Sequence, residues 1–403
     1  MEENKICDLC KSKRLIVLMP PHECKTLVTG KEMMTATIGV VMCSDCGYVL
    51  LSPRMDKKGL VSFYECQSKY TRSFEELKKS SYAILCDMQF EFIKENCGET
   101  FQRVLEVGSA EGCFLSILSD KGLNVEGIEP SFAYEEYYTK NIPNVKVHLS
   151  TLEAAKLQES HYSLCVLRHV LEHVISPLST LKLVYKLLKD KGHIYIEVPN
   201  LARAQVALYD YFHLEHISYF TLHTLRYACE LSGFKIIRVE QWDNNPKDSG
   251  INYPVLRVIA QKDICNLSSD IISPDHTISL DAFNNYSKRR EAILSNYYIS
   301  LKSDILKWYK FGKRIAIFGG GPHTADLLQI LDIPENIFIC AFDNDQRKWG
   351  KRIGQIQIES PKEVIAYDPD IVIISSYEYE NEIAKGIESW KNKGIKIQKI
   401  YNL

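Results

Sequence analysis

The chain has 403 residues, of which 45% are hydrophobic and 25% charged, and its formal net charge is −2. This composition is ordinary for a folded chain long enough for two or three domains, and so balanced a charge gives no sign of a nucleic-acid or acidic-lipid surface. The start, MEENKICDLC, lacks a basic stretch followed by an apolar one, and no apolar run approaches the roughly 20 residues that span a bilayer, so we expect a cytoplasmic protein.

Two regularly spaced cysteine pairs stand in the N-terminal segment: Cys7-x2-Cys10 and Cys43-x2-Cys46. Each CxxC forms a tight turn that aims two thiolates at one point, and two such turns complete a tetrahedral four-thiolate site, which suits zinc. Four thiolates leave no open position, so this zinc would be structural and would replace the core that so short a segment lacks. A redox CxxC and reduced cysteines without metal are the alternatives.

The next two segments differ in their apolar pattern. From 61 to 100, SFEELKKSSYAILCDMQFEFIKENCG has apolar residues at three-and-four spacing, which predicts a helical connector that ends at Gly98 and packs on the next domain. From 101 to 265, the short apolar runs RVLEV, NVEGIE, VKVHL, YSLCVL and GHIYIEV alternate with helical stretches, which predicts a parallel sheet with crossover helices. Two closely spaced strands, FKIIRVEQW and YPVLRVIAQ, then predict a hairpin with one strand running against the rest.

A glycine-containing loop, LEVGSAEG, joins the first strand of the middle domain to its first helix. Gly108 and Gly112 let the backbone pass close to a ligand, but their GxxxG spacing is not the GxGxxG that a dinucleotide pyrophosphate prefers. Glu106 precedes the loop, where it could meet an amine or a cation. Glu129 ends the second strand, where a carboxylate binds ribose hydroxyls. A ribose, no pyrophosphate and a positive centre describe S-adenosylmethionine.

More ordinary interpretations stay open at these positions. The two glycines could serve turn geometry alone, and Glu129 could be a solvated strand end. His169 and His173, four residues apart in LRHVLEHV, are expected on one helix face beside Glu172. Two histidines with no third ligand nearby make a weak metal site, so a structural or pocket-edge role is preferred.

The segment from 275 to 403 opens with a long predicted helix, about Leu280 to Phe311. A second βα pattern follows in KRIAIFGGG, HTADLLQIL, IFICAFDND and DIVIISS, which predicts half of a doubly wound sheet. The GGG turn before a helix and Asp343 after the next strand have the geometry of a nucleotide-binding turn, with an active NAD site as one interpretation. However, GGGPHT is not GxGxxG.

The motifs VLEVGSAEGCFL, GIEPS, LRHVLEHV and KGHIYIEVPN, in this order, resemble the class I S-adenosylmethionine-dependent methyltransferases, whose fold also ends in a reversed hairpin. Over nearly all 403 residues, the chain is similar to the sugar-nucleotide C-methyltransferases, which build branched deoxysugars from dTDP-4-keto sugars. The resemblance implies an α/β protein with a Rossmann-like class I methyltransferase core. Its implied parts are a zinc-binding module (1–60), a helical connector (61–100), a methyltransferase domain (101–265) and a C-terminal Rossmann-like sugar-nucleotide-binding domain (275–403).

The resemblance also implies roles around the cofactor. The residues that would line its methionine part are Glu106, Gly108 and Gly112. Glu129 would hold the ribose, and Arg168 and His169 would border the same pocket.

The acceptor segment, FHLEHISYFT (residues 212–221), follows the fifth strand, and in this fold that loop faces the methyl group. A carbon acceptor needs a base to remove a C–H proton next to a carbonyl, and a donor to steady the enolate oxygen. His216 could be the base, and Tyr219 or His213 a hydrogen-bond donor. An ordinary hydrogen-bonded loop histidine is the alternative for His216.

The match of this segment to the C-methyltransferases, which show a Tyr-His-Glu-His run and then an aromatic pair, is incomplete. The matching residues are Glu215, His216, Tyr219 and Phe220. Leu214 stands where the first histidine of the run would be, and His213 falls at the tyrosine's place. Because related O- and N-methyltransferases carry similar loops, the segment indicates methyl transfer and a base without selecting carbon. Tyr70, and Tyr377 with Glu378, are further candidates near the cleft.

We therefore expect a methyltransferase that uses S-adenosylmethionine on a nucleotide-linked keto sugar, with C-methylation preferred and a structural zinc ion. O- or N-methylation of a sugar or another small metabolite is the alternative within the class. An NAD-dependent sugar-nucleotide oxidoreductase and a non-catalytic zinc-bearing scaffold are the alternatives outside it. No nucleic-acid or membrane partner is expected. The sequence leaves open the nucleotide, the sugar, the oligomeric state and whether the C-terminal domain binds a nucleotide or only shapes the cleft.

Overall fold

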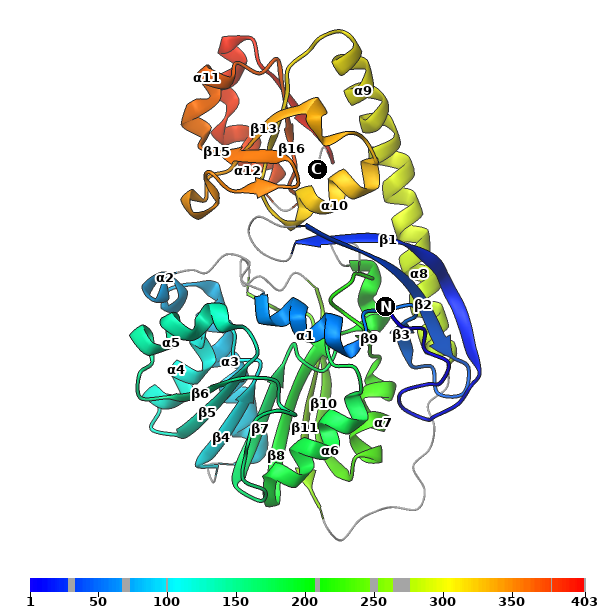
Figure 1. Cartoon of the computed structure of the whole chain (residues 1–403), viewed down its shortest axis with the longest axis vertical. Coiled ribbons are helices and arrows are strands. Elements are labelled where there is room, and N and C mark those ends of the chain that lie inside the picture. The colour runs from blue at the N-terminus through cyan, green and yellow to red at the C-terminus, as the bar shows by residue number, and fades with distance from the viewer. Residues whose placement is uncertain are drawn as a thin grey trace.

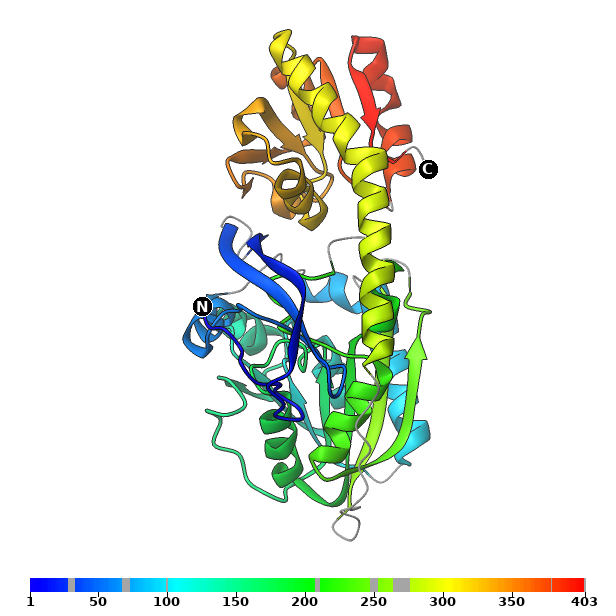
Figure 2. The same cartoon turned by 90° about the vertical axis from the view of Figure 1, so that its right-hand side faces the viewer.

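The computed structural model describes residues 1–27, 33–66, 73–98, 101–206, 211–246, 253–263, 276–377 and 379–401. Two α/β domains lie one above the other, and an N-terminal β-arm reaches between them (Figure 1). A long helix runs along one side and joins the domains, as the turned view in Figure 2 shows. That helix comprises α8 (Thr277–Ile293), a π-helical turn (Leu294–Tyr298) and α9 (Ile299–Lys310), so the single long helix predicted there is confirmed.

The lower domain contains a seven-stranded sheet in the order β10-β11-β8-β7-β4-β5-β6. Its strands are β4 (Arg103–Val107), β5 (Asn124–Glu129), β6 (Lys146–Leu149), β7 (Tyr162–Arg168), β8 (Leu188–Pro199), β10 (Phe234–Trp242) and β11 (Val255–Lys262). Strands β4 to β8 are parallel, and β11 pairs antiparallel with both β8 and β10. The predicted fold class, with one strand reversed in the hairpin that ends this domain, is confirmed.

Helices cover both faces of this sheet. They are α4 (Cys113–Asp120), α5 (Glu135–Asn141), α6 (Pro177–Leu187) and α7 (Leu222–Leu231), with α1 (Lys57–Cys66), α2 (Phe74–Lys78) and α3 (Ser81–Cys97) from the connector. Along β7, Cys165 and Leu167 pack in the core beneath α6 and α7, while Leu164 and Val166 pack in the core beneath α3 and α4. This alternation is why a strand buried on both sides is a continuous apolar run in the sequence.

Two local predictions from the middle segment are wrong. The helical stretch predicted before the run GHIYIEV stops at Leu187, and β8 begins at the next residue, ahead of that run. The stretch LRHVLEHV is no helix but a turn after β7, because His169 has a positive φ of 53°, which breaks helical geometry. The regularly spaced apolar residues of this stretch, Val170, Leu171 and Val174, pack from the turn into the core of the domain.

The N-terminal segment holds strands that the sequence did not reveal. Strands β1 (Leu15–Leu27) and β2 (Met33–Cys43) pair antiparallel as the arm, and β3 (Val49–Leu51) pairs with β2. The fourth strand of this sheet is β9 (Ser218–Tyr219), which lies within the acceptor segment. The acceptor segment is therefore partly a strand, and the N-terminal module supplies its pairing partner.

The C-terminal domain has a six-stranded sheet in the order β14-β15-β13-β12-β16-β17, parallel except for the β14–β15 pair. Its strands are β12 (Ile315–Phe318), β13 (Phe338–Phe342), β14 (Arg352–Ile353), β15 (Ile356–Glu359), β16 (Ile371–Ile374) and β17 (Lys396–Lys399). Its α-helices are α10 (Pro322–Leu331), α11 (Val364–Tyr367) and α12 (Glu380–Gly386). The predicted second βα sheet is present.

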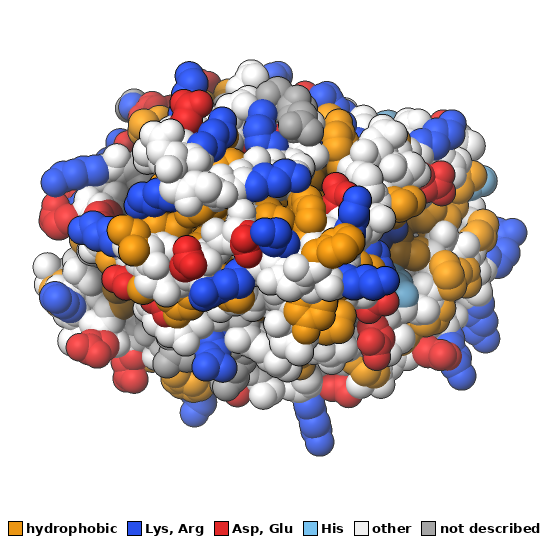
Figure 3. All heavy atoms as spheres, turned by 90° about the horizontal axis from the view of Figure 1, so that it is seen from above, with side chains coloured by type: hydrophobic (Ala, Val, Ile, Leu, Met, Phe, Trp, Pro, Cys, Tyr) orange, Lys and Arg blue, Asp and Glu red, His pale blue; other side chains and the backbone are white. Residues whose placement is uncertain are grey.

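Short 3₁₀ helices in the described ranges are Phe132–Tyr134, Leu201–Val206, Glu335–Ile337, Gln346–Lys348, Pro361–Glu363 and Glu388–Lys393. Seen from the C-terminal end, Lys and Arg side chains are interspersed with Asp and Glu side chains (Figure 3). Among the described residues, no helix is long and apolar enough to cross a membrane.

A buried ion pair between β11 and β8 gives a first prediction. The Arg257 Nε lies 2.9 Å from the Glu197 Oε2, and the two side chains are 1% and 0% exposed. Arg257→Leu leaves a buried carboxylate with one cation fewer, so we expect a loss of about 3 kcal/mol in the free energy of unfolding, measured with urea. Arg238→Leu, on the neighbouring strand with a side chain 56% exposed, should change it by less than about 0.5 kcal/mol. Equal losses in both variants would contradict a stabilising role for the buried pair.

Candidate functional site

A cavity of about 410 Å³ opens at the carboxyl ends of β4, β5 and β7. Ligands of open parallel sheets bind at this edge, where the connections from neighbouring strands leave toward opposite faces. Residues from the strand ends form one wall, and α1 of the connector forms another. The lining residues that matter below are Tyr64, Gly108, Glu129, His169 and His173.

Gly108 forms part of the wall at the end of β4. Its φ is +72°, and an added Cβ would lie 2.5 Å from a methyl group of Val170, so a side chain has no room there. Gly112 begins α4 with a φ of +71°, and its added Cβ would lie 2.9 Å from Ile142 instead. Only Gly108 of the two predicted glycines lines the cavity.

Glu129 is buried in the cavity wall and not solvated, so the interpretation as a solvated strand end is wrong. Its Oε2 accepts a hydrogen bond from the Ala110 backbone N–H at 2.8 Å, and its Oε1 accepts one from Ser131 at 2.9 Å. Burial raises the pKa of this carboxyl, although both backbone N–H groups act against that rise. The two hydrogen bonds fix a carboxylate at the edge of the cavity, with acceptor capacity left on each oxygen.

Glu106 and Arg168 form a buried ion pair behind the cavity. The Arg168 Nη2 lies 3.1 Å from the Glu106 Oε1, and the side chains are 6% and 0% exposed. Arg168 also donates to the Tyr82 hydroxyl and the Cys86 sulfur of α3, and its guanidinium lies 4.3 Å from the Phe114 ring centre. Neither charged group belongs to the cavity lining, so the pair fastens the connector to the sheet.

His169 lines the cavity and lies between two buried carboxylates. Its Nδ1 lies 3.1 Å from the Glu172 Oε1, and its Nε2 lies 3.4 Å from the Glu197 Oε1. Burial alone would lower the pKa of His169, but the two carboxylates raise it to about 9. Burial would raise the pKa of Glu197, yet His169 and Arg257 hold it at about 2. At neutral pH, His169 is therefore a cation held by its neighbours.

The acceptor segment lies directly beside this wall. The His216 ring, only 7% exposed, packs 4.8 Å from the His173 ring and 4.0 Å from the His213 ring, between ring centroids. Tyr219 lies farther off, at 6.4 Å, and its hydroxyl donates weakly to the His213 carbonyl at 3.4 Å. The structure thus brings His213, His216 and Tyr219 together next to His173, which lines the cavity.

Main-chain contacts hold the acceptor segment from two sides. The Glu172 carbonyl accepts hydrogen bonds from the backbone N–H groups of Ile217 and Ser218, at 2.9 and 3.0 Å. On the other side, β9 pairs with β3, and the Tyr48 hydroxyl donates to the Ser218 hydroxyl at 2.5 Å. Through Tyr48 and β3, the N-terminal module contacts the segment that carries His216.

Three side chains of this region form a compact group that the sequence did not reveal. One possible ligand atom from each of Glu172, His173 and His216 lies within 4.8 Å of the others. A third ligand is therefore near His173, contrary to the expectation that none lies nearby. His216 stands far along the chain, so only the paired acceptor segment brings it to the turn after β7.

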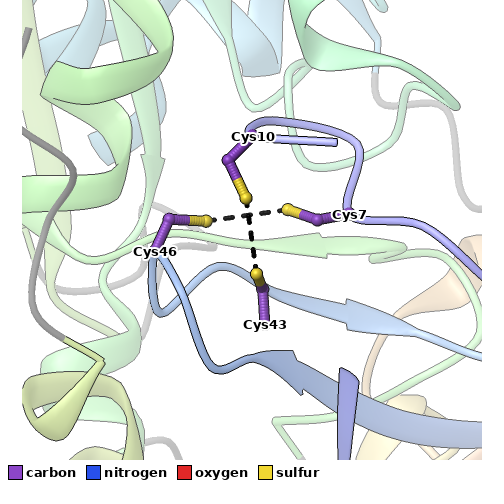
Figure 4. Close-up of side chains that lie close together, drawn as sticks. All are labelled: Cys7, Cys10, Cys43 and Cys46. Atoms are coloured by element: carbon purple, nitrogen blue, oxygen red, sulfur yellow. Dashed lines mark hydrogen bonds between the residues drawn. The ribbon is translucent and has the colours of Figure 1, made fainter. Parts of the chain in front are cut away.

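The four predicted cysteines meet at one point (Figure 4). The Sγ atoms of Cys7 and Cys46 are 3.6 Å apart, and those of Cys10 and Cys43 are 3.4 Å apart. Zinc–sulfur bonds of about 2.3 Å in a tetrahedron require sulfurs about 3.8 Å apart, so the group fits zinc closely. Cys24, in contrast, is buried in the apolar cluster around β1 and β2.

The two cysteine turns share one backbone design. The residue after each pair, Lys11 or Gly47, has a positive φ of 63° or 68°. Its N–H donates to the carbonyl of the first cysteine, at 3.1 Å for Cys7 and 2.9 Å for Cys43. The Cys46 sulfur and two backbone N–H groups lower the pKa of Cys7 against the effect of burial, which favours the thiolate that a metal needs.

Residues 62–239 match a family model described as a methyltransferase domain. This match and the Rossmann-like order of the seven-stranded sheet identify a methyltransferase domain in this part of the chain. Residues 311–401 match a second family model, described as "C2185-like, N-terminal". A search of curated proteins finds no match to the chain.

Solved structures similar to the chain cover about half of it. A methyltransferase from Archaeoglobus fulgidus is 18% identical, with 48% of this chain and 100% of that chain covered and a TM-score of 0.37. The 1,6-didemethyltoxoflavin-N1-methyltransferase from Burkholderia thailandensis, with S-adenosylhomocysteine bound, is 14% identical, with 54% and 96% covered and a TM-score of 0.38. One from Mesorhizobium loti is 16% identical, with 44% and 99% covered and a TM-score of 0.37. Likenesses this distant carry no argument about the acceptor.

Outside the methyltransferase domain, a cavity of about 610 Å³ lies at the glycine turn of the C-terminal domain. Asp343 accepts hydrogen bonds there from the Gly320 N–H at 2.7 Å and from the Lys348 ammonium at 2.9 Å. The N-terminus of α10 and Lys348 supply positive character to this cavity. Tyr377 packs on Tyr401, whereas Tyr70 and Glu378 lie outside the described residues.

The raised pKa of His169 predicts how stability of the methyltransferase domain varies with pH. Since the folded value, about 9, exceeds the ordinary value of 6.5, the charged histidine stabilises the fold fully below pH 6.5 and loses its effect as pH rises through 9. His169→Gln should lower the free energy of unfolding by up to about 3 kcal/mol at pH 6, and by much less at pH 9.5. Urea unfolding at both pH values measures this. His223→Gln, at an exposed position of α7, is the control. A loss that is the same at both pH values would contradict a charged His169.

Proposed function

We propose that the 410 Å³ cavity holds S-adenosylmethionine, and that the protein methylates a carbon next to the keto group of a nucleotide-linked sugar, with His216 as the base. Bound there, S-adenosylmethionine supplies an electrophilic methyl group. The cavity has the size of an ordinary small-ligand site. The fixed Glu129 carboxylate at the end of β5 suits ribose hydroxyls, and Gly108 allows a ligand to approach the backbone closely.

The observation that carries the proposal is the packing of His216 against His173, a wall residue of the cavity. It puts a possible base from the acceptor segment at the edge of the space that the methyl donor would fill. Imidazole titrates near neutral pH, so it can take a proton from a carbon acidified by a neighbouring carbonyl. Glu215 contributes through its carbonyl oxygen, which accepts the Nδ1 hydrogen of His173 at 2.8 Å.

Each proposed step is assigned to side chains of this chain. His216 accepts the C–H proton, and the electrons of that bond move toward the keto oxygen. Tyr219 or His213 donates a hydrogen bond to that oxygen as it becomes negative. The carbon then takes the methyl group as the methyl–sulfur bond breaks, with that bond's electron pair left on the sulfur of S-adenosylhomocysteine. The carbonyl re-forms, and the proton leaves His216 to water. O- or N-methylation needs neither proton removal from carbon nor enolate stabilisation.

The nucleotide part of the acceptor is proposed to bind the C-terminal domain. Support comes from the cavity at its glycine turn, where the α10 N-terminus and Lys348 suit a phosphate. Asp343, which follows β13, stands where a carboxylate meets ribose hydroxyls in such sheets.

We also propose a structural zinc ion bound by Cys7, Cys10, Cys43 and Cys46. The sulfur spacing and the matched backbone turns support it. Four thiolate ligands leave no position for a substrate, so the ion would stabilise the N-terminal module and take no part in methyl transfer.

The acceptor chemistry is tested by proton exchange in deuterated water. With S-adenosylhomocysteine and a nucleotide-linked 4-keto sugar, the wild type should exchange the proton on the carbon beside the keto group, and His216→Asn should slow this by about 100-fold or more. NMR of the sugar measures the exchange. His223→Asn is the control, and calorimetry should give equal S-adenosylmethionine binding in all three proteins. Undiminished exchange in His216→Asn excludes His216 as the base. Methylation without exchange favours an oxygen or nitrogen acceptor. Binding of NAD(H) but not of S-adenosylmethionine would overturn the proposal.

The zinc proposal is tested by metal analysis of the purified protein. The wild type should carry about one zinc ion per chain, and Cys43→Ser should lose it, together with several kcal/mol of the free energy of unfolding. Cys24→Ser, which changes a buried cysteine outside the group, should keep its zinc. Wild-type protein without bound metal, or zinc retained in Cys43→Ser, would refute the assignment.

A further inference from the structure

The group of Glu172, His173 and His216 has features that a proton-transfer role for His216 leaves unused. The Glu172 side chain is 1% exposed, and its Oε1 accepts a hydrogen bond from His169. Among the described residues, its Oε2 has no hydrogen-bond partner, although it is buried. A buried carboxylate oxygen left in this way costs free energy, which a cation or a proton donor would offset.

His173 is held in the orientation of a metal ligand. Its Nδ1 lies 2.8 Å from the Glu215 carbonyl oxygen and 2.6 Å from the Tyr64 hydroxyl. The carbonyl can only accept, whereas the hydroxyl can accept or donate, so a hydrogen on Nδ1 suits both neighbours. The lone pair of the neutral ring is then on Nε2, which lies 3.8 Å from the Glu172 Oε1. Metal-binding histidines are commonly fixed by such a bond from the other ring nitrogen to a backbone carbonyl.

The spacing of the group suits a small cation. Zinc binds histidine nitrogen and carboxylate oxygen at about 2.0 to 2.2 Å, so ligand atoms in a tetrahedron lie about 3.4 Å apart. The distance of 3.8 Å between His173 and Glu172 is close to that value, and the whole group lies within 4.8 Å. A shift of the His216 ring by about an ångström toward Glu172 and His173 would bring all three ligand atoms to the spacing of a bound ion. His173 lines the cavity, so an ion can enter from there.

We propose that Glu172, His173 and His216 form a second divalent-cation site, separate from the four cysteines, and that an ion bound there inhibits methyl transfer. Two imidazoles and one carboxylate select zinc and cobalt over magnesium and calcium, which prefer oxygen ligands. Three protein ligands leave a fourth position open toward the cavity.

Inhibition follows from competition for one electron pair. A cation bound to the His216 nitrogen occupies the lone pair that would accept the acceptor's proton, so the ion and the proton exclude each other. The bound ion also places positive charge beside the proposed position of the sulfonium group. The inhibitory effect rests on the proposed role of His216 as base, whereas binding of the ion does not.

Cobalt is the probe that separates this site from the cysteines. Protein with zinc in the four-cysteine site is titrated with Co²⁺, and we expect one further equivalent to bind. Its visible absorption should lack the intense sulfur-to-cobalt bands of thiolate ligation, and added Zn²⁺ should displace it, since zinc binds such ligands more tightly. Glu172→Gln and His173→Gln should each weaken the binding by about 100-fold or more, because each removes one of three ligands.

Matched variants at exposed positions control for non-specific effects. Glu159→Gln and His223→Gln change the same residue types outside the group and should bind Co²⁺ as the wild type does. Far-UV circular dichroism and urea unfolding, measured without added Co²⁺, check that Glu172→Gln and His173→Gln still fold. If Co²⁺ gives no new spectrum, or binds both of these folded variants as tightly as the wild type, the site is refuted.

The inhibitory role has its own measurement. Exchange of the acceptor proton in the wild type should fall in proportion to Co²⁺ occupancy, and a chelator too weak to strip the four-cysteine site should restore it. Full exchange at saturating Co²⁺ overturns inhibition. Exchange that is absent even without Co²⁺ counts against the proposed carbon acceptor and leaves the binding result to decide the cation site.

Discussion

The antiparallel pairing of β3 with β9 is the interaction on which the arrangement of the site depends. Strand β3 follows the second cysteine turn directly, and β9 lies inside the acceptor segment, two residues after His216. Tyr48 reinforces the pairing through Ser218 and packs on Phe220. Together with the burial of Phe212, Leu214 and Ile217 in an apolar cluster, this pairing holds the acceptor segment in one conformation. The proposed zinc ion takes no part in the reaction, but it would stabilise the position of β3 and, through β9, the acceptor segment.

Charge balance among the buried groups behind and beside the cavity is the second constraint. Burying a carboxylate costs several kcal/mol unless a partner compensates it. Glu106 is matched by Arg168, and Glu197 by Arg257 and His169. Arg168 donates to Cys86 of α3, and Glu197 accepts a hydrogen bond from Gln89 of the same helix, so these charged groups also join the connector to the sheet. Glu172 is paired with His169, but its second buried oxygen, like that of Glu106, has no hydrogen-bond partner in the described part of the chain. The Glu172 carboxylate lies beside the proposed base, His216.

The N-terminal module links both domains. Its cysteines pack in the core beneath the methyltransferase sheet, while its arm reaches α10 of the C-terminal domain, where Gln329 donates to the Glu23 carbonyl at 3.2 Å. Helix α10 begins at the glycine turn of the C-terminal cavity. One small module therefore contacts the acceptor segment and the element that borders the proposed nucleotide site. A nucleotide-linked acceptor would have to bridge these same two places.

The sequence by itself determined the elements whose signal is local. Strands buried on both faces appear as apolar runs in the sequence, so the sheet and its reversed strand were predictable. The CxxC pairs and Gly108 mark tight backbone turns, so the cysteine group and the turn after β4 were predictable as well. The arm was missed because its pairing, not its composition, makes it a strand. The residue spacing in LRHVLEHV predicts a helix, but a spacing pattern does not reveal the positive φ of His169 that begins a turn there. Only the tertiary structure decided that Glu106 faces Arg168 behind the cavity, and that His216 joins Glu172 and His173, because these contacts join segments far apart in the chain.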